Sequence, residues 1–212
     1  MTGISTYRNC AGAAGCIKQA GYDFIFRYYS RLTRMPEKRM QQDEAQAISN
    51  VGLQLAVVYQ DSANAPDYFT LVRGIKDGQY AYNYAIQGIG QPAGSTIYFA
   101  VDYDATQQQI QNAVSNYFLG VKRGMEEASD DQPIYNIGVY GSGATCRLVR
   151  ANLPFVTYSW LALATRWREY STYTDWNIKQ VKVTESLCGL PANDWQRVEV
   201  KSDFGQFRLA VA

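Results

Sequence analysis

Short apolar runs alternate with amphipathic stretches along almost the whole of this 212-residue chain. The apolar runs predict buried strands, and the stretches between them carry apolar residues at helical spacing. Short connections between the two are typical of a parallel sheet covered by helices. The expected strands cover residues 3–7, 24–29, 53–59, 97–104, 134–140, 160–164, 176–181 and 198–200. Because eight such strands close into a barrel, we predict an α/β fold, a single TIM-like (β/α)8 barrel.

The helices expected between these strands are uneven in length. They cover residues 11–20, 38–50, 67–87, 106–128 and 144–152. The stretch 184–194 looks irregular and stands in the place of a helix. The chain carries no repeat, low-complexity tract or linker, and its length suits one large domain. We therefore predict one compact barrel domain over residues 1–212, with some helices short or missing.

Two carboxylates end the apolar run that begins at Ile97. Side chains of a strand alternate between its faces, so Asp102 and Asp104 are expected to lie on one face. Parallel α/β folds place their chemistry at the carboxyl ends of the strands. The pair is therefore the first candidate for a catalytic site.

The chain contains no histidine. This excludes a Ser-His-Asp or Cys-His arrangement within the chain, and it excludes zinc sites that need histidine. Proton transfer near neutral pH must fall to Asp, Glu, Tyr, Lys or Cys. We expect no bound metal and no cofactor.

Charge and hydropathy restrict the partners and the location. The net charge is +1 and no basic stripe is present, so a nucleic-acid partner is not expected. No apolar run is long enough to span a membrane. The first residues lack the basic and apolar regions of a signal peptide, which predicts a protein made in the cytoplasm without one.

Four cysteines leave the redox state open. Cys10, Cys16, Cys146 and Cys188 form no C-x-x-C pair, so a redox motif or a structural zinc site is not expected. An even number permits two disulfides in three pairings, and the sequence does not choose among them. Free buried thiols are the alternative.

Several of these segments resemble a known family. The segments, in chain order, are Phe26-Arg27-Tyr28, Gly52-Leu53, Val58-Tyr59-Gln60, Gly90-Gln91-Pro92-Ala93-Gly94, Ile97 to Asp104, Gly138-Val139-Tyr140-Gly141 and Trp160-Leu161-Ala162. Together they resemble the bacterial glycoside-hydrolase-like domain of undefined function, over about residues 21–180. That family is similar to the Chalaropsis-type lysozymes, which are muramidases on a β/α barrel. The resemblance implies a barrel that acts on the glycan of peptidoglycan.

The resemblance also implies roles for particular acids. The fourth strand of the lysozymes ends in Asp-x-Glu, and the matching positions here are Asp102 and Asp104. The lysozymes also carry an acid on the first strand, where this chain has Ser5. Asp203 matches another acid of their site. The missing first-strand acid puts lysozyme activity in doubt more than it does the fold.

Glycoside cleavage needs a proton donor and usually a second carboxylate. Two acids close together raise the pKa of one of them, so Asp102 and Asp104 are predicted to be catalytic. The alternative for Asp104 is that it only caps the helix that follows.

Other residues at or near strand ends are candidates for substrate binding. They are Arg27, Tyr59, Asp61, Tyr140, Trp160, Gln180 and Asp203. Arg27 could pair with Asp102, or it could form an ion pair that only supports the fold. Trp160 could stack on a sugar or fill the core, and packing is equally the alternative for the two tyrosines. Asp61 could line the mouth or be a solvated loop acid.

We therefore expect a lysozyme-like peptidoglycan hydrolase, exported by a specialised route to the periplasm or cell wall as an antibacterial effector or lysin. Such a protein could meet an immunity protein or secretion machinery. The second hypothesis is a catalytically decayed barrel that binds cell-wall glycan or a protein partner. A third, weaker one is a hydrolase that holds a magnesium-like ion with carboxylates alone.

Overall fold

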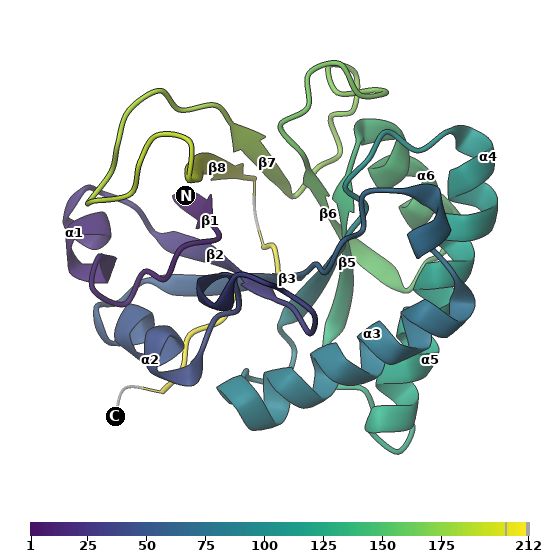
Figure 1. Cartoon of the computed structure of the whole chain (residues 1–212), viewed down its shortest axis with the longest axis horizontal. Helices are drawn as coiled ribbons and strands as arrows, with labels where there is room; N and C mark the ends of the chain where they lie inside the picture. The colour runs from purple at the N-terminus through teal and green to yellow at the C-terminus, as the bar shows by residue number, and fades with distance from the viewer. Residues whose placement is uncertain (202, 211–212) are drawn as a thin grey trace.

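The structure is a computed structural model that describes residues 1–201 and 203–210, and its centre is a closed eight-stranded barrel (Figure 1). Neighbouring strands follow the order of the chain. They are β1 (Thr2–Thr6), β2 (Phe24–Tyr29), β3 (Gln54–Tyr59), β4 (Thr96–Ala100), β5 (Asn136–Gly141), β6 (Val156–Leu161), β7 (Ile178–Val181) and β8 (Trp195–Val200). The predicted TIM-like barrel is confirmed.

The direction of one strand differs from the prediction. Strands β1 to β7 run parallel to their neighbours, as expected. Strand β8 runs antiparallel to both β7 and β1, so the expectation of an all-parallel sheet is wrong there. The connection 182–194 carries no helix, and a helix is what usually returns the chain for a parallel crossover. The connection returns the chain as a hairpin, so β8 runs in the opposite direction. The connection 162–177 also lacks a helix and leads to a parallel strand, so the missing helix alone does not set the direction of β8.

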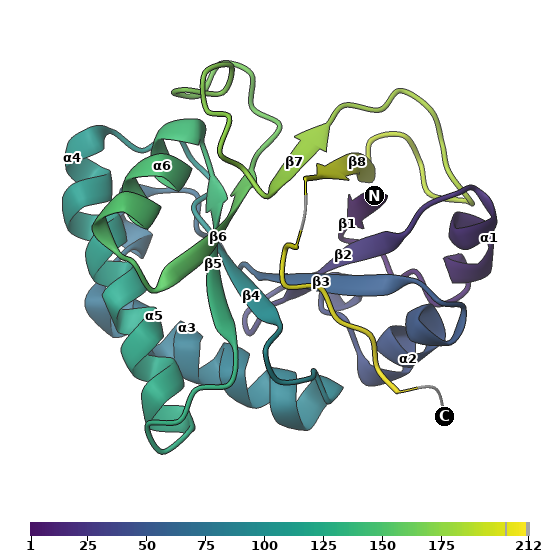
Figure 2. The same ribbon diagram turned by 180° about the vertical axis from the view of Figure 1, so that it is seen from behind.

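Helices cover the barrel unevenly (Figures 1 and 2). They are α1 (Ala14–Gln19), α2 (Gln42–Asn50), α3 (Leu71–Asn83), α4 (Gln107–Gln109), α5 (Ser115–Ala128) and α6 (Gly143–Asn152). The π-helical turn η3 (Tyr84–Ile89) continues α3, and η4 (Ile110–Val114) joins α4 to α5, so 107–128 is one helical run close to the predicted 106–128. In the described chain no helix follows β6 or β7, which matches the expectation of missing helices.

The two longest helices, α3 and α5, lie side by side and touch through glycines (Figure 1). A Cβ at Gly78 would come within 2.3 Å of the Val121 carbonyl oxygen, and one at Gly124 within 2.1 Å of that of Ile75. Gly74 and Gly120 pack in the same way. Spacing of four residues places both glycines of each helix on one face, and this lets the backbones meet.

Aromatic rings fill the interior of the barrel. Phe26 lies 4.3 Å from Trp160, and Tyr98 lies 6.0 Å from it, between ring centroids. Phe204 closes the end where β2 and β4 begin, since it packs on Phe24 at 4.8 Å and accepts a hydrogen bond from the Tyr98 hydroxyl at 2.8 Å. Figure 2 shows the C-terminal segment that contains Phe204, drawn in yellow, passing along β3. Within the described residues, aromatic rings therefore fill this end of the barrel interior.

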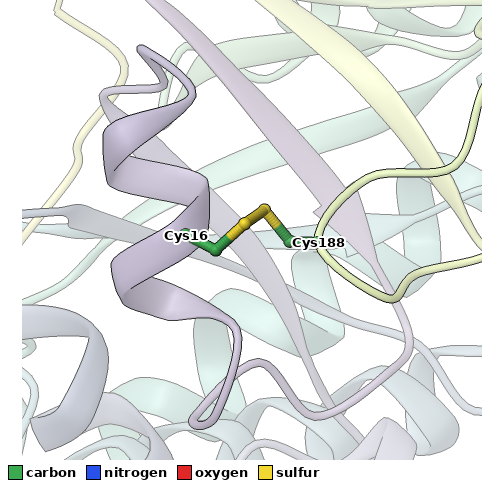
Figure 3. The surroundings of a disulfide bond; sticks show 2 residues. All are labelled: Cys16 and Cys188. Atoms are coloured by element: carbon green, nitrogen blue, oxygen red, sulfur yellow. A yellow bond between two sulfur atoms is a disulfide. The ribbon is translucent and has the colours of Figure 1, made fainter.

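The cysteines divide between the two alternatives. Cys16 on α1 and Cys188 on the β7–β8 connection form a disulfide that spans 172 residues of sequence (Figure 3). Cys10 and Cys146 are buried free thiols, and burial raises the pKa of each to about 12. The disulfide ties the irregular connection to the helical layer and closes a long loop of the unfolded chain.

Candidate active site at the barrel mouth

The candidate site lies where β1 to β7 end and β8 begins. Strand pairing places Ser5 beside Gln196, and the alternation that points Phe26 inward also points Tyr28 inward. Strand alternation and the loops that follow the strands together bring a set of polar side chains to this end. They are Ser5, Tyr28, Gln60, Asp102, Tyr140, Gln180 and Gln196. The interior is therefore aromatic below and polar at the mouth.

Asp102 is the half-buried carboxylate of this mouth. Its backbone N–H donates to the Ala63 carbonyl oxygen at 2.7 Å, which fixes the chain just after β4. Its Oδ2 accepts a hydrogen bond from Gln60 Nε2 at 2.9 Å, and Gln60 Oε1 accepts one from Lys38 Nζ at 3.2 Å. Burial raises the pKa of Asp102, although the Gln60 hydrogen bond and the Lys38 charge act in the opposite direction. Asp102 therefore holds its proton to a higher pH than an ordinary aspartate.

Two tyrosines share the mouth with Asp102. Burial raises the pKa of Tyr28 to about 12, and the charge of Asp102 adds to this. The pKa of Tyr140 is also raised, for the same two reasons in the same order. Both hydroxyls stay neutral, so each keeps its one O–H donor and can also accept a hydrogen bond. Tyr140 donates to Gln180 Oε1 at 3.3 Å, so these two candidate residues lie together at the mouth.

An amide network occupies the side of the mouth formed by β1, β7 and β8. Gln180 Nε2 donates to Ser5 Oγ at 3.2 Å and lies 3.4 Å from Gln196 Oε1. Gln196 also lines a cavity of about 350 Å³ that continues toward Leu163 and Lys182. Ser5 stands where the resemblance implies an acid, so the hydrogen-bonding side chains of this network are all neutral.

Asp104 does not pair with Asp102. Its Oδ2 lies 2.8 Å from Arg168 Nη1, and its Oδ1 accepts from the Arg168 backbone N–H at 2.9 Å. Gln60 reaches Asp102 from the loop after β3, whereas Arg168 reaches Asp104 from the loop after β6. Because β4 ends at Ala100, the strand alternation from which a shared face was expected does not extend to these acids, and each acid has its own partner.

Two further expectations about this acid pair are corrected. The helix that follows begins with a capping box formed by Thr106 and Gln109, so capping by Asp104 is wrong. The pKa of Asp102 is raised by burial, without a contribution from Asp104. Asp104 instead attaches the β6–β7 loop to the rim.

Arg27 faces the helical layer rather than the mouth. Its Nε lies 2.6 Å from Glu44 Oε1 on α2, and both side chains are fully buried. Nη1 donates to the Thr6 carbonyl oxygen at 2.9 Å and Nη2 to that of Glu37 at 2.6 Å. Arg27 is thus the structural ion pair, and the expectation that it partners Asp102 is wrong. Its phase on β2, opposite to Phe26, is the signal that would have shown this.

Tyr59 and Asp61 also lie outside the barrel. The Tyr59 hydroxyl is 2.7 Å from Asp61 Oδ2 and 3.0 Å from Oδ1 of the buried Asp77. Asp61 Oδ1 accepts from the backbone N–H groups of Arg31 and Leu32 at 2.9 and 3.0 Å. These hydrogen bonds order the loop after β2. Tyr59 and Asp61 were predicted to join the mouth, and the structure places neither of them there.

The last two candidates lie below the mouth. Trp160 is fully buried and packs against Tyr140 with ring centroids 5.1 Å apart, so it supports the mouth from the core. Asp203 follows β8, and β8 pairs Glu199 with Thr2 at the opposite end of the barrel. Its carboxylate accepts from Tyr158 Oη at 2.8 Å. The expectation that Asp203 joins Asp102 is wrong.

Tyr28, Lys38, Gln60 and Gln196 are the residues of the mouth that sequence reasoning missed. Gln60 follows a predicted strand directly, and Tyr28 shares the phase of Phe26, so both carried a usable signal. Lys38 comes from η1 (Pro36–Lys38), a single turn whose position no pattern predicts.

The part of the chain that the structure describes contains no candidate metal site and no candidate membrane-spanning helix. Within residues 1–201 and 203–210, no three His, Cys, Asp or Glu side chains gather to hold an ion. Across the same residues no helix has the length and hydropathy to cross a bilayer.

Comparison with known proteins agrees with this architecture. The uncharacterized protein FadG of Bacillus subtilis (strain 168) is 33% identical over 150 residues, which are 68% of this chain and 25% of FadG. The chain thus spans about a quarter of that relative. The Tat-secreted protein Rv2525c of Mycobacterium tuberculosis has a TM-score of 0.76 at 21% identity, over 97% of this chain and 98% of that one.

A glycosyl hydrolase 25 of Streptococcus pneumoniae, the virulence factor GHIP, has a TM-score of 0.62 at 11% identity, over 94% of this chain and 87% of that one. At such low identities the two structural likenesses show the fold alone. The family model of Rv2525c-like, glycoside hydrolase-like domains matches residues 15–211. Since this match covers nearly the whole chain, the protein belongs to the Rv2525c-like, glycoside hydrolase-like family.

Proposed function

We propose that this protein hydrolyses the glycan strands of bacterial peptidoglycan, with Asp102 as the proton donor. One observation carries the proposal: the mouth of a hydrolase-like barrel holds a half-buried carboxyl whose pKa is raised by burial. A carboxylic acid that keeps its proton is what protonation of a glycosidic oxygen requires. Of the two acids predicted to be catalytic, we assign the proton-donor role to Asp102.

The step needs a nucleophile as well as an acid. As the protonated Asp102 gives its proton to the glycosidic oxygen, the bond from that oxygen to the anomeric carbon breaks. Arg168 holds Asp104 and Ser5 carries no charge, so we assign the attack to the acetamido oxygen of the sugar itself. The ionised Asp102 then takes a proton from water, which opens the cyclic intermediate with net retention. We expect the neutral Tyr28 and Tyr140 to orient the acetamido group.

Action outside the cytoplasm is part of the proposal. The Cys16–Cys188 disulfide suits an oxidising compartment. The related Rv2525c is a Tat-secreted protein. We infer that this chain reaches the cell wall by an export route of its own, and its dependence on secretion machinery or an immunity protein stays a proposal.

Release of new reducing ends from purified cell walls tests the hydrolase. We expect Asp102→Asn to lower the rate by about 100-fold or more, which is the usual loss of a general acid. Asp203→Asn is the matched control, since Asp203 is an exposed aspartate at the other end of the barrel, and its rate should equal that of the native protein. An inactive native protein, or an active Asp102→Asn variant, contradicts the proposal.

A second function is favoured by the neutral side of the mouth. Ser5, Gln180 and Gln196 form a hydrogen-bonding wall without a second acid, which suits a module that binds glycan and does not cut it. Sedimentation with insoluble peptidoglycan separates the two. Saturable binding with no soluble fragments by mass spectrometry identifies the binding module.

A further inference from the structure

One ammonium group at the mouth lacks an acidic partner. Lys38 belongs to none of the ion pairs within 4.0 Å among the described residues. Its nearest polar partner is the neutral Gln60 amide oxygen at 3.2 Å, and Nζ lies 5.0 Å from the centroid of the Tyr28 ring. Asp102 and Asp61 act on it only from farther away. A half-buried cation with neutral contacts is incompletely compensated.

The position of this cation relative to Asp102 is fixed by Gln60. The amide of Gln60 accepts from Lys38 and donates to Asp102, so ammonium, amide and carboxyl form a row along the mouth. Burial lowers the pKa of Lys38 while these distant acids raise it, which is the behaviour of a charge without a close partner. A ligand carboxylate could replace water at Nζ and leave the Gln60 bond in place, because an ammonium group has three donors.

We propose that Lys38 forms a subsite for the carboxylate of an acidic sugar bound at the mouth. The ligand class is a hexose that carries a carboxyl group, either on a lactyl ether or as a uronic acid. The inference rests on the glycan-binding part of the proposed function and needs no catalysis. For peptidoglycan it points to strands whose lactyl carboxylate is free. A reaction that hydrolyses the amide between lactyl group and stem peptide must then supply the substrate.

Two sugars test this directly, because N-acetylmuramic acid differs from N-acetylglucosamine only by the lactyl ether. We expect NMR titration at about pH 7 to give the native protein about tenfold tighter binding of N-acetylmuramic acid, the usual effect of one charge-assisted hydrogen bond. Lys38→Met keeps the apolar stem over Tyr28 and should bind the two sugars within about twofold of each other. Lys18→Met, which removes an exposed lysine of α1, is the matched control and should keep the preference.

Glucuronic acid identifies the source of the carboxylate. Tighter binding of N-acetylmuramic acid than of glucuronic acid assigns the lactyl group, and the reverse order assigns a uronic acid; either order above N-acetylglucosamine supports the subsite. Equal binding of acidic and neutral sugars by the native protein overturns it. So does a preference that survives in a folded Lys38→Met variant, or the absence of saturable binding of both acids.

The same titration separates this inference from the hydrolase proposal. Asp102→Asn should retain the preference for the acidic sugar, since Asp102 is not the charge that binds the carboxylate. A preference without release of reducing ends leaves the Lys38 subsite standing and removes the hydrolase. Release of reducing ends without a preference for the acidic sugar supports the hydrolase and overturns the Lys38 subsite.

Discussion

Arg27 and Asp102 are charged side chains near strand ends of one barrel, and they are treated in opposite ways. Arg27 lies outside β2, fully buried, with Glu44 at 2.6 Å and two backbone carbonyl oxygens as further partners. Asp102 lies inside the mouth, half-buried, with the neutral amide of Gln60 as its side-chain partner. The Arg27 charge has an acidic partner and two carbonyl oxygens within the protein. The Asp102 carboxyl has no basic partner at hydrogen-bond distance among the described residues.

The difference separates support of the fold from chemistry. A buried pair with every donor satisfied resists change, since removal of one partner leaves a charge in the interior. A half-buried carboxyl without a cation at contact distance keeps a raised pKa, and this costs stability while it prepares proton transfer. Proximity to a strand end therefore does not identify a site residue by itself; the partners of its side chain do.

Arg27→Met should have the largest effect on stability. It leaves Glu44 buried and uncompensated, so we expect the free energy of unfolding in urea to fall by about 3–5 kcal/mol. Arg27→Met combined with Glu44→Met removes both charges and should recover part of that loss. If Arg27→Met alone is as stable as the native protein, Arg27 does not support the fold as an ion pair, and the contrast with Asp102 fails.

Asp102→Asn should change stability in the opposite direction. The folded-state pKa of Asp102 is raised, so its favourable contribution is complete below the unfolded pKa and is lost as the pH rises through the folded pKa. An asparagine cannot ionise, and the variant should be more stable than the native protein at about pH 7. This advantage should shrink as the pH falls toward about 4, the value of an unfolded aspartate. Urea unfolding at both pH values checks the sign, and a destabilised variant at pH 7 contradicts it.

Gln60→Leu should move the pH dependence of hydrolysis. The Gln60 hydrogen bond lowers the pKa of Asp102, so its loss should raise that pKa further and shift the fall in rate to higher pH. Initial rates across pH 4 to 9 measure the shift, with Gln54→Leu, at the start of β3, as the control that leaves the profile unchanged. An unshifted profile in Gln60→Leu separates Asp102 from the proton-donor role.

Arg168→Gln should have the smallest effect. Its pair with Asp104 is partly exposed, at 47% and 29% of the side-chain surfaces, and such pairs contribute less than about 1 kcal/mol. If Asp104 only attaches the β6–β7 loop, the rate of hydrolysis should change by less than about threefold. A much larger change, in either direction, would return Asp104 to the catalytic site.

The site could be predicted from the sequence only in part. Asp102, Tyr140 and Gln180, all predicted as site residues, do lie together near the carboxyl end of the fourth strand. Alternation along β2 also indicates that Arg27 points outward, because Arg27 has the opposite phase to Phe26. The positions of Asp104 and Asp203 could not be read in the same way, because both lie beyond the end of a strand, where no period fixes a side chain.

The sequence by itself determined the number and order of the strands, because burial on a sheet leaves apolar runs that are visible without coordinates. Only the tertiary structure decided the direction of β8, the pairing of Cys16 with Cys188, and the row of Lys38, Gln60 and Asp102. An apolar run reads the same for either strand direction, and a disulfide across 172 residues leaves no local pattern. Contacts between loops depend on how the closed barrel brings distant strand ends together, and that information is not local.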